Sequence, residues 1–148
     1  MISTRSVKTF ITENSKQTQE LGKILAREIN TDKIICLEGN LGTGKTTFAQ
    51  GFLKGLGIKG PFTSPTFVIF KYYKSRKLKN FNIYHMDAYR VNAKDVLNLG
   101  WKEIVAGKDN IIIIEWADRI KKIIPKGAVW IKFKWLSEKK REILFKSE

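Results

Sequence analysis

The apolar and polar positions along the chain follow two different periods, which predicts a fold that mixes strands and helices. Residues 34–37, Ile-Ile-Cys-Leu, form an apolar run rich in β-branched side chains, which is typical of a strand buried on both faces. A short glycine-rich segment follows this run. Beyond it, apolar residues recur at i, i+3, i+4 and i+7, the period of a helix with one buried face: Ala49, Phe52, Leu53 and Leu56.

An additional strand and helix are predicted ahead of this unit. Residues 5–12 fit an edge strand. Asn14 or Ser15 can cap a helix, because their side-chain oxygens can accept a hydrogen bond from a backbone N–H of the first turn. The apolar residues of this helix are expected to share one face: Leu21, Ile24, Leu25 and Ile29.

Behind the central unit, the pattern predicts a hairpin and an interrupted helix. Residues 66–73 and 81–90 fit its two strands, which are joined by the charged turn 74–80. Residues 93–105 carry apolar side chains at helical spacing, but Gly100 lies among them. We therefore expect a covering helix that can be broken at this glycine.

The last third of the chain predicts three more strands. Residues 110–116, with four consecutive isoleucines, fit a buried strand. Residues 128–135 alternate between apolar and polar positions, as expected for a strand with one wet face. Residues 141–147 should pair with them through the turn 137–140, as an antiparallel hairpin at one edge of the sheet.

Length and composition favour a single domain over residues 1–148, without support from disulfides. Cys36, the only cysteine, lies in a predicted buried strand, where it fits a small apolar side chain better than a reactive thiol. This suits a reducing, cytoplasmic location. The sequence contains neither the apolar core of a signal peptide nor a run long enough to span a membrane.

The formal net charge of +14 favours a polyanionic partner such as RNA. An equally good explanation is compositional bias, because the chain has 22 lysines, only 6 arginines and 19 isoleucines. Phosphate-binding surfaces usually recruit arginine as well as lysine. The best candidate for a basic patch lies on the C-terminal hairpin: Lys132, Lys134, Lys139, Lys140 and Arg141.

The glycine-rich segment matches the phosphate-binding pattern G-x-x-x-x-G-K-[ST], and its predicted strand and helix give the context that this motif requires. In such a loop, backbone N–H groups surround phosphate oxygens, the lysine reaches the β- and γ-phosphates, and the hydroxyl helps to coordinate Mg²⁺. We therefore expect ATP and Mg²⁺ to bind; the guanine-reading motif Asn-Lys-x-Asp does not occur in the sequence. The loop residues expected to bind are Gly39, Asn40, Leu41, Gly42, Thr43, Gly44, Lys45, Thr46 and Thr47.

This loop also specifies the expected fold class. We predict an α/β, P-loop NTPase-like fold of three layers, with helices on both faces of the sheet. The central sheet should be mostly parallel and carry antiparallel hairpins.

Two carboxylates fall at the ends of predicted strands, where they could act on a bound nucleotide. Asp87 ends an otherwise apolar row, so it needs a partner such as Arg90, a lysine, a metal or water. Glu115 ends the isoleucine strand and can hold a Mg²⁺-bound water or polarise the attacking one. The alternative for Glu115 is an ion pair with Arg119 or Lys121. The sequence does not distinguish which carboxylate is the general base.

Two more polar residues allow both a structural and a functional interpretation. Thr66 lies in a loop after the first nucleotide-binding helix, where it could sense the γ-phosphate and Mg²⁺ or simply take part in a turn. His85 is the only histidine, and a lone histidine is more often structural than catalytic.

Four blocks occur in order along the chain: GNLGTGKTT, TSPTF, HMDAYR and IIEW. Together they resemble the TsaE family, bacterial ATPases required for making threonylcarbamoyladenosine in tRNA. The resemblance runs from the first predicted helix through Trp116. Asn40 and Thr43 stand where family members commonly carry Asp and Ala, but the loop uses backbone groups at these positions.

The resemblance implies roles for individual residues. Thr46 and Glu115 would be the Mg²⁺-associated pair, and Lys45 the lysine that holds phosphate. Asp87 falls on the family's essential aspartate. The expected catalytic residues are therefore Lys45, Asp87 and Glu115.

The resemblance also implies partners and a slow basal reaction. Thr66 lies in a switch-like segment, and Trp116 directly follows the strand-end glutamate, so both are expected at the nucleotide. The partners would be a threonylcarbamoyl transferase subunit and its paralogous dimer partner, with possible tRNA contact through the basic surface. Arg90 and Arg119 are the only nearby arginines, so hydrolysis should be slow until the partner completes the site.

Two other functions fit parts of the sequence. GNLGTGK also fits the loops of small-molecule kinases, although no segment supplies the paired arginines of a kinase lid. A basic RNA-binding module with a vestigial nucleotide site would bind tRNA in a salt-sensitive way that does not depend on Lys45.

Overall fold

The computed structural model describes residues 7–28, 34–60, 62, 70–75 and 81–147. Thr66 and residues 76–80 of the predicted turn lie outside these residues, and Lys74 and Ser75 belong to β3. The elements, in chain order, are β1 (Val7–Thr12), α1 (Ser15–Glu28), β2 (Ile34–Glu38), α2 (Lys45–Gly55), β3 (Phe70–Ser75), β4 (Phe81–Asp87), α3 (Ala93–Leu97), α4 (Trp101–Ala106), β5 (Asn110–Glu115), the 3₁₀ helix η1 (Ala117–Ile123), β6 (Val129–Trp135) and β7 (Arg141–Ser147).

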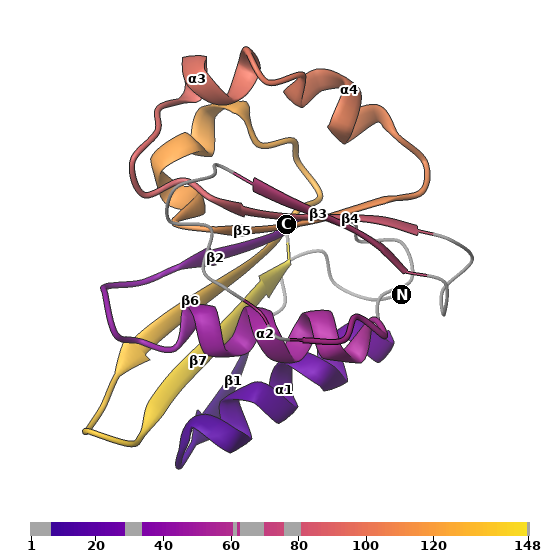
Figure 1. Ribbon diagram of the computed structural model, residues 1–148. Coiled ribbons are helices and arrows are strands. Elements are labelled where there is room, and N and C mark those ends of the chain that lie inside the picture. The colour runs from indigo at the N-terminus through magenta and orange to yellow at the C-terminus, as the bar shows by residue number, and fades with distance from the viewer. Residues whose placement is uncertain (1–6, 29–33, 61, 63–69, 76–80, 148) are drawn as a thin grey trace.

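Within the described residues, seven strands form one mixed sheet in the order β1-β7-β6-β2-β5-β4-β3. The central strands β6, β2, β5 and β4 are parallel to one another. Antiparallel pairs flank them, β3 with β4 on one side and β6 with β7 and β1 on the other. Helices α1 and α2 cover one face, and α3, α4 and η1 cover the other (Figure 1). The predicted three-layer α/β fold, with a largely parallel sheet centre, is confirmed.

Each face of the sheet has its own apolar core, which explains the run of isoleucines in β5. Ile111 and Ile113 belong to the core beneath α1 and α2. Ile112 and Ile114 belong to the core beneath the other helices. Because successive side chains of a strand point to opposite faces, a central strand covered on both sides is apolar throughout. Glu115, the next residue, therefore points to the α2 face.

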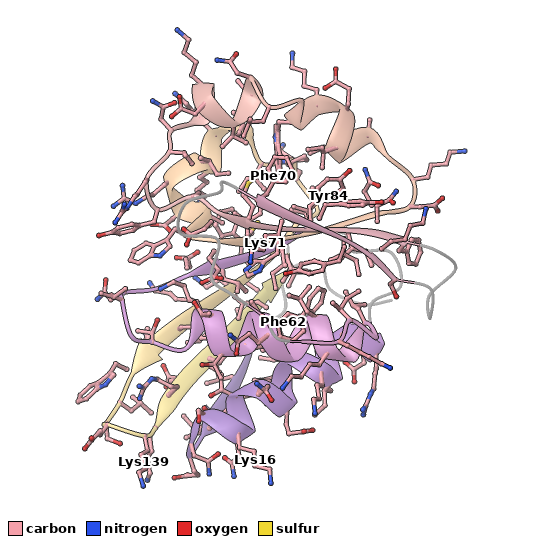
Figure 2. The ribbon with its side chains drawn as sticks, viewed as in Figure 1. Lys16, Phe62, Phe70, Lys71, Tyr84 and Lys139 are labelled. Atoms are coloured by element: carbon pink, nitrogen blue, oxygen red, sulfur yellow. The ribbon has the colours of Figure 1, made fainter. Side chains whose placement is uncertain are left out.

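Different aromatic side chains pack on the two faces of the sheet. Figure 2 labels Phe70 and Tyr84, whose rings lie 5.8 Å apart on the side of α3 and α4. On the α2 face, the ring of Phe48 packs edge-on against that of Phe133 at 5.4 Å. Trp130 is also buried, on the face that was expected to be wet, because η1 covers that end of β6. The predicted one-sided burial of β6 is therefore wrong at Trp130.

The apolar face predicted for α1 is confirmed only in part: Leu21 and Leu25 pack against the core, and Ile29 lies outside the described residues. Thr18, Gly22 and Ala26 are buried, whereas Ile24 is 45% exposed. The reason is the close approach of α1 to α2, where there is room only for small side chains. A Cβ added at Gly51 of α2 would lie 2.0 Å from the backbone oxygen of the facing residue, Gln19.

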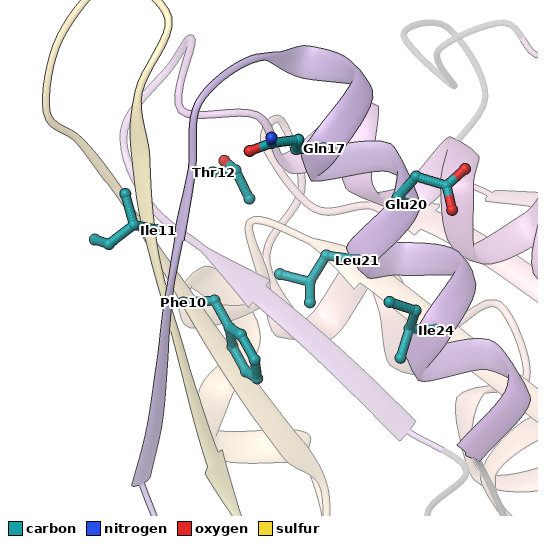
Figure 3. Close-up of a pocket in the computed structure, with 7 residues that line it drawn as sticks. All are labelled: Phe10, Ile11, Thr12, Gln17, Glu20, Leu21 and Ile24. Atoms are coloured by element: carbon teal, nitrogen blue, oxygen red, sulfur yellow. The ribbon is translucent and has the colours of Figure 1, made fainter.

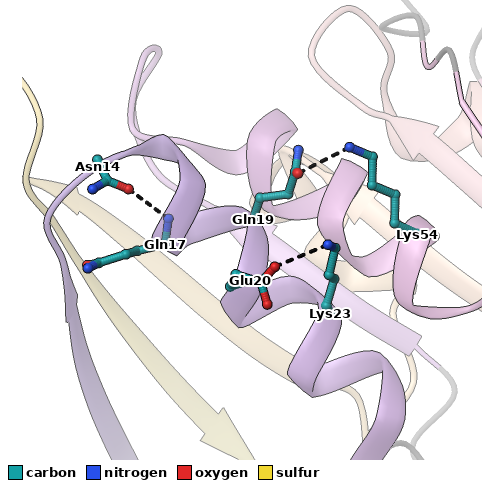
Figure 4. Close-up of polar contacts among 6 residues, drawn as sticks. All are labelled: Asn14, Gln17, Gln19, Glu20, Lys23 and Lys54. Carbon is teal, nitrogen blue, oxygen red and sulfur yellow. Dashed lines mark hydrogen bonds and ion pairs between the residues drawn. The ribbon is translucent and has the colours of Figure 1, made fainter.

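Polar contacts fix the start and the outer side of α1 (Figure 4). Asn14 caps the helix, because its Oδ1 accepts a hydrogen bond from the backbone N–H of Gln17 at 2.9 Å. Lys54 of α2 donates to Gln19 Oε1 at 3.1 Å, which links the two helices. Of the two predicted caps, the structure uses Asn14.

Strand β1 forms the edge of the sheet, as predicted, and it pairs with β7 from Val7 opposite Lys146 to Thr12 opposite Arg141. The sequence also predicted the β6–β7 hairpin at this edge of the sheet. The hairpin lies one strand further in, because β1 pairs outside β7. A shallow pocket separates β1 from α1, with Phe10, Leu21 and Ile24 among its apolar lining residues (Figure 3).

The interrupted helix is confirmed as the pair α3 and α4. Asn92 and Asp95 form a reciprocal capping box at the start of α3. Gly100, in the left-handed conformation with φ of 85°, precedes α4. No helix in the described parts of the chain is long and apolar enough to cross a bilayer.

Candidate nucleotide-binding site

The glycine-rich loop joins the carboxyl end of β2 to the start of α2, as its motif predicts. Gly39 has a φ of 146°, and a Cβ there would lie 2.6 Å from the carbonyl oxygen of Phe133 in β6. Gly44 directly precedes α2 with a φ of 100° and provides no side-chain cap. The first N–H groups of α2 therefore have no capping side chain from this position, and the positive end of the helix dipole faces the loop.

Lys45, the first residue of α2, is buried behind this loop. Its Nζ donates hydrogen bonds to the carbonyl oxygens of Gly39 at 2.6 Å and Asn40 at 2.9 Å. Burial lowers the pKa of the Lys45 ammonium, while the nearby carboxylates of Glu115, Asp118 and Asp87 act in the opposite direction. The loop thus holds a desolvated cation within reach of several acidic groups.

Thr46, in the first turn of α2, meets Glu115 at the carboxyl end of β5. The Thr46 hydroxyl donates to Glu115 Oε1 at 2.7 Å, across 69 residues of sequence. The other oxygen, Oε2, lies 2.7 Å from His85 Nε2. Glu115 is only 2% exposed, so these two partners satisfy a buried carboxylate. They stand in place of the ion pair with Arg119 or Lys121 that the sequence also allowed.

Asp87 ends β4 directly opposite Glu115 in the pairing of β4 with β5. Its Oδ1 accepts a hydrogen bond from the backbone N–H of Tyr89 at 2.9 Å. Burial raises the pKa of the Asp87 carboxyl, the bond from Tyr89 opposes this, and the negative charge of Glu115 raises it further. Of the partners proposed for Asp87 from sequence, a lysine contributes, since Lys45 also stabilises its charge.

Trp116 places an aromatic ring over the lysine. Its backbone is left-handed, with a φ of 59°, which is uncommon for a residue other than glycine. The Lys45 Nζ lies 4.0 Å from the centre of the Trp116 ring, within cation–π range. Tyr89 packs on the same ring at 4.8 Å, and the Arg119 guanidinium lies 5.0 Å from the Tyr89 ring.

The residues predicted for the loop occupy it or the first turn of α2, from Gly39 to Thr47. Leu41 is 82% exposed at the tip of the loop, and the Thr43 hydroxyl donates to the Asn40 carbonyl at 2.6 Å. Thr66, the candidate sensor, falls outside the described residues. The structure gathers the others, because Lys45, Thr46, Asp87, Glu115 and Trp116 are linked by the contacts above.

Sequence reasoning missed two kinds of partner at this site. His85 was interpreted as structural, although its alternation with Asp87 along β4 could have placed both side chains on the Glu115 face. The aromatic cluster of Tyr89 and Trp116 with Arg119 had no signal in the sequence pattern.

The side-chain oxygens of Thr46 and Glu115 fit a magnesium ion that would also be coordinated by a nucleotide phosphate. Among the described residues, no three His, Cys, Asp or Glu side chains gather as a metal cage. A threonine hydroxyl and a carboxylate in contact are hard oxygen ligands, and Mg²⁺ is usually held by few protein groups together with phosphates and water. Thr46 and Glu115 are therefore the residues suited to hold it.

Comparison with known proteins identifies the family. The sequence model of the family described as threonylcarbamoyl adenosine biosynthesis protein TsaE matches residues 12–143. The chain belongs to the TsaE family. The resemblance of its four sequence blocks is thereby confirmed.

Individual TsaE proteins match most of the chain. The tRNA threonylcarbamoyladenosine biosynthesis protein TsaE of Bacillus subtilis is 37% identical over 134 residues, which cover 90% of this chain and 82% of that protein. The TsaE protein of Treponema pallidum is 33% identical over 134 residues, 90% of this chain and 96% of its own length. A crystal structure of Bacillus subtilis YdiB superimposes with a TM-score of 0.79 at 32% identity and covers 99% of this chain and 88% of that one.

Proposed function

We propose that this protein is a Mg-ATP-binding ATPase that supports the making of threonylcarbamoyladenosine in tRNA. It would work in the cytoplasm as a single domain over residues 1–148, acting on the threonylcarbamoyl transferase subunit and its paralogous dimer partner. The observation that carries the proposal is the Thr46–Glu115 hydrogen bond beside the buried Lys45, at the end of a phosphate-binding loop.

Binding of the triphosphate would rest on the loop and on Lys45. The N–H groups of the loop and of the first turn of α2 are available as donors for anionic oxygens, and the helix dipole favours negative charge there. Lys45 now bonds to two carbonyls of its own loop. A phosphate would offer it a charged acceptor instead, and charge-assisted bonds are stronger than those to neutral carbonyls.

Mg²⁺, when bound, would neutralise charge on the phosphates and bridge their oxygens. On the protein side, Thr46 and Glu115 would hold it. Glu115 has protein donors on both oxygens. This engagement favours Glu115 as the metal-associated residue.

Asp87 is the better candidate to orient the attacking water and take its proton. The bond described for this carboxylate uses Oδ1 and comes from a backbone N–H. Its pKa is raised by burial, and a raised pKa makes a carboxylate a stronger proton acceptor near neutral pH.

Hydrolysis by the isolated protein should be slow. Arg119 lies over the rings of Tyr89 and Trp116, and Arg90 is exposed beyond β4. Since an arginine that reaches the transferring phosphoryl group accelerates such reactions by about 10³–10⁵, completion of the site by the partner would explain a low basal rate.

The proposal includes contact with tRNA through the basic surface around the C-terminal hairpin. Figure 2 labels Lys16 and Lys139, which both point away from the molecule at the same end. Nearby, Lys134 lies 3.9 Å from Glu142 and Lys140 lies 3.5 Å from Glu13, so part of the positive charge is already paired.

The decisive experiment is steady-state ATP hydrolysis by the purified protein, alone and then with the transferase pair and tRNA. We expect a slow rate that rises with the pair and is lost in Asp87→Ala. Asp109→Ala is the matched control, because Asp109 is an exposed aspartate that precedes β5, at the end of the strand opposite Glu115. If the pair changes nothing while a small acceptor stimulates ADP formation without phosphate release, the protein is a kinase instead.

Equilibrium binding of ATP distinguishes a working ATPase from an RNA-binding module with a vestigial nucleotide site. Lys45→Ala removes a charged donor, and hydrogen bonds to charged groups contribute about 1.5–3 kcal/mol, or roughly a 10- to 150-fold loss of affinity. Lys54→Ala, at the far end of the same helix, should bind normally. Retained ATP affinity in a folded Lys45→Ala protein would contradict the proposal.

A further inference from the structure

His85 is buried beneath the site without a task in the proposed chemistry. It is 2% exposed, and its Nε2 lies 2.7 Å from Glu115 Oε2. Its second ring nitrogen, Nδ1, is a buried polar atom without a hydrogen-bond partner in the described structure. A polar ring placed in this way needs a reason other than packing, because an apolar side chain would fill the space without a buried polar atom.

The strand pairing explains how His85 reaches Glu115. Strands β4 and β5 are parallel neighbours, with His85 opposite Ile113 and Asp87 opposite Glu115. His85 and Asp87 are two residues apart, so both point to the same face of β4. The side chains of Thr46, Glu115 and His85 thus form one chain of hydrogen bonds that links the first turn of α2 to β5 and β4.

We propose that His85 is a positioning residue that fixes the Glu115 carboxylate for Mg²⁺, an inference that rests on the proposed Mg-ATP-binding function. A carboxylate accepts hydrogen bonds only, so the partner assigns the ring hydrogen to Nε2. With Thr46 on Oε1 and His85 on Oε2, rotation of the carboxylate would break at least one bond. The plane of the carboxylate is therefore fixed before any ligand arrives.

His85 is expected to affect binding of Mg²⁺ but not binding of metal-free nucleotide. Lys45 and the loop backbone would hold the phosphates, and the Lys45 ammonium bonds to the carbonyls of Gly39 and Asn40, whereas His85 bonds directly to Glu115. Groups that orient a metal ligand typically contribute 10- to 100-fold to metal affinity. Loss of the His85 bond should therefore raise the Mg²⁺ requirement and leave binding of metal-free ATP unchanged.

Three substitutions test the hydrogen bond itself. His85→Leu removes the donor. His85→Gln can place an amide N–H near the Nε2 position, while the shorter His85→Asn cannot reach it. Ile83→Val is the matched control, since Ile83 is a fully buried neighbour on the same face of β4 and its change alters packing alone.

The measurement is calorimetric titration with ATP, in EDTA and over a series of Mg²⁺ concentrations, with thermal unfolding of each variant beside it. We expect His85→Leu and His85→Asn to need roughly 10- to 100-fold more Mg²⁺ for half-maximal enhancement of ATP affinity. His85→Gln should keep the wild-type Mg²⁺ requirement. Ile83→Val should lower the Tm and leave the Mg²⁺ requirement unchanged. If His85→Leu does not fold, the contrast between Gln and Asn decides.

The possible failures are distinguishable. Wild-type protein that binds no ATP with or without Mg²⁺ would refute the proposed function and the role of His85 with it. Wild-type protein that responds to Mg²⁺, with an equal response in His85→Leu, would overturn only the positioning role. An equal loss in His85→Gln and His85→Asn that follows their loss of Tm would show that the ring is merely structural.

Discussion

Substitution of Gly51 by alanine tests the close approach of α1 and α2 that the structure describes. The new Cβ would lie 2.0 Å from the Gln19 oxygen, 2.7 Å from its carbonyl carbon and 2.9 Å from its Cα. All three are backbone atoms, so a change of rotamer cannot relieve the clash. The helices would have to separate by about 1 Å, and overpacking of this kind costs about 1–3 kcal/mol.

Two other terms decide the net effect of Gly51→Ala. Alanine favours the helix over glycine by about 1 kcal/mol, which offsets part of the clash. Separation of the helices also loosens the packing around Phe48 and Ala26, which are fully or nearly fully buried at this contact. We therefore expect a net loss of about 2 kcal/mol, which in a protein of this size lowers the Tm by roughly 4–8 °C.

The assay is thermal and urea unfolding of Gly51→Ala beside Gly60→Ala. Gly60 lies outside the helices, does not have a left-handed backbone, and a Cβ there would meet its nearest neighbours at 3.5 Å. Alanine at this control position should leave stability unchanged or raise it by about 0.4–1 kcal/mol. If Gly51→Ala were as stable as the control, the contact between α1 and α2 would not be as close as described.

Three more outcomes follow from the site and its surroundings. Thr46→Val should abolish Mg²⁺-dependent hydrolysis and also lower the free energy of unfolding by about 1–3 kcal/mol, because Glu115 loses a buried donor; unchanged urea unfolding would contradict this. Addition of Mg-ATP should change the fluorescence of Trp116 as Lys45 exchanges its partners, and the change should disappear in Trp116→Phe. Asn92→Ala should cost about 1 kcal/mol through loss of the capping box but leave ATP affinity intact; an affinity change would tie α3 to the site.

The parts of the fold that could be predicted are those whose signal is local. The strand, loop and helix from Ile34 to Leu56 follow from periodicity and a contiguous motif, and the break at Gly100 follows from one residue type. Glu115 could be placed at the end of a strand because four isoleucines precede it. The pairing of Glu115 with Thr46, 69 residues away, was implied only by the family resemblance, and the bond to His85, 30 residues away, was not predicted.

The error at α1 has a different cause. Hydrophobicity predicted that Ile24 would be buried, but the packed face is selected by size, with Gly22 against α2 and Gly51 against α1. A pattern of apolar residues does not report how closely two backbones approach. The glycines were visible in the sequence, yet only the pairing of the two helices gives them meaning.

The site residues lie at the parallel centre of the sheet, and the antiparallel edge strands contribute none of the bonds described between them. Parallel strands end at the same edge, so β2 delivers the loop with Lys45 and Thr46, β5 delivers Glu115, and β4 delivers Asp87. The Thr46–Glu115 bond crosses from α2 to β5, and the bond from His85 crosses from β4 to β5. Strand β1 supplies none of these groups, so changes in β1 can lower stability while the Thr46–Glu115 and His85–Glu115 bonds keep their geometry. A shift between β4 and β5, by contrast, must disturb the fold and the proposed chemistry together, because the same buried carboxylate links both strands to the nucleotide-binding loop.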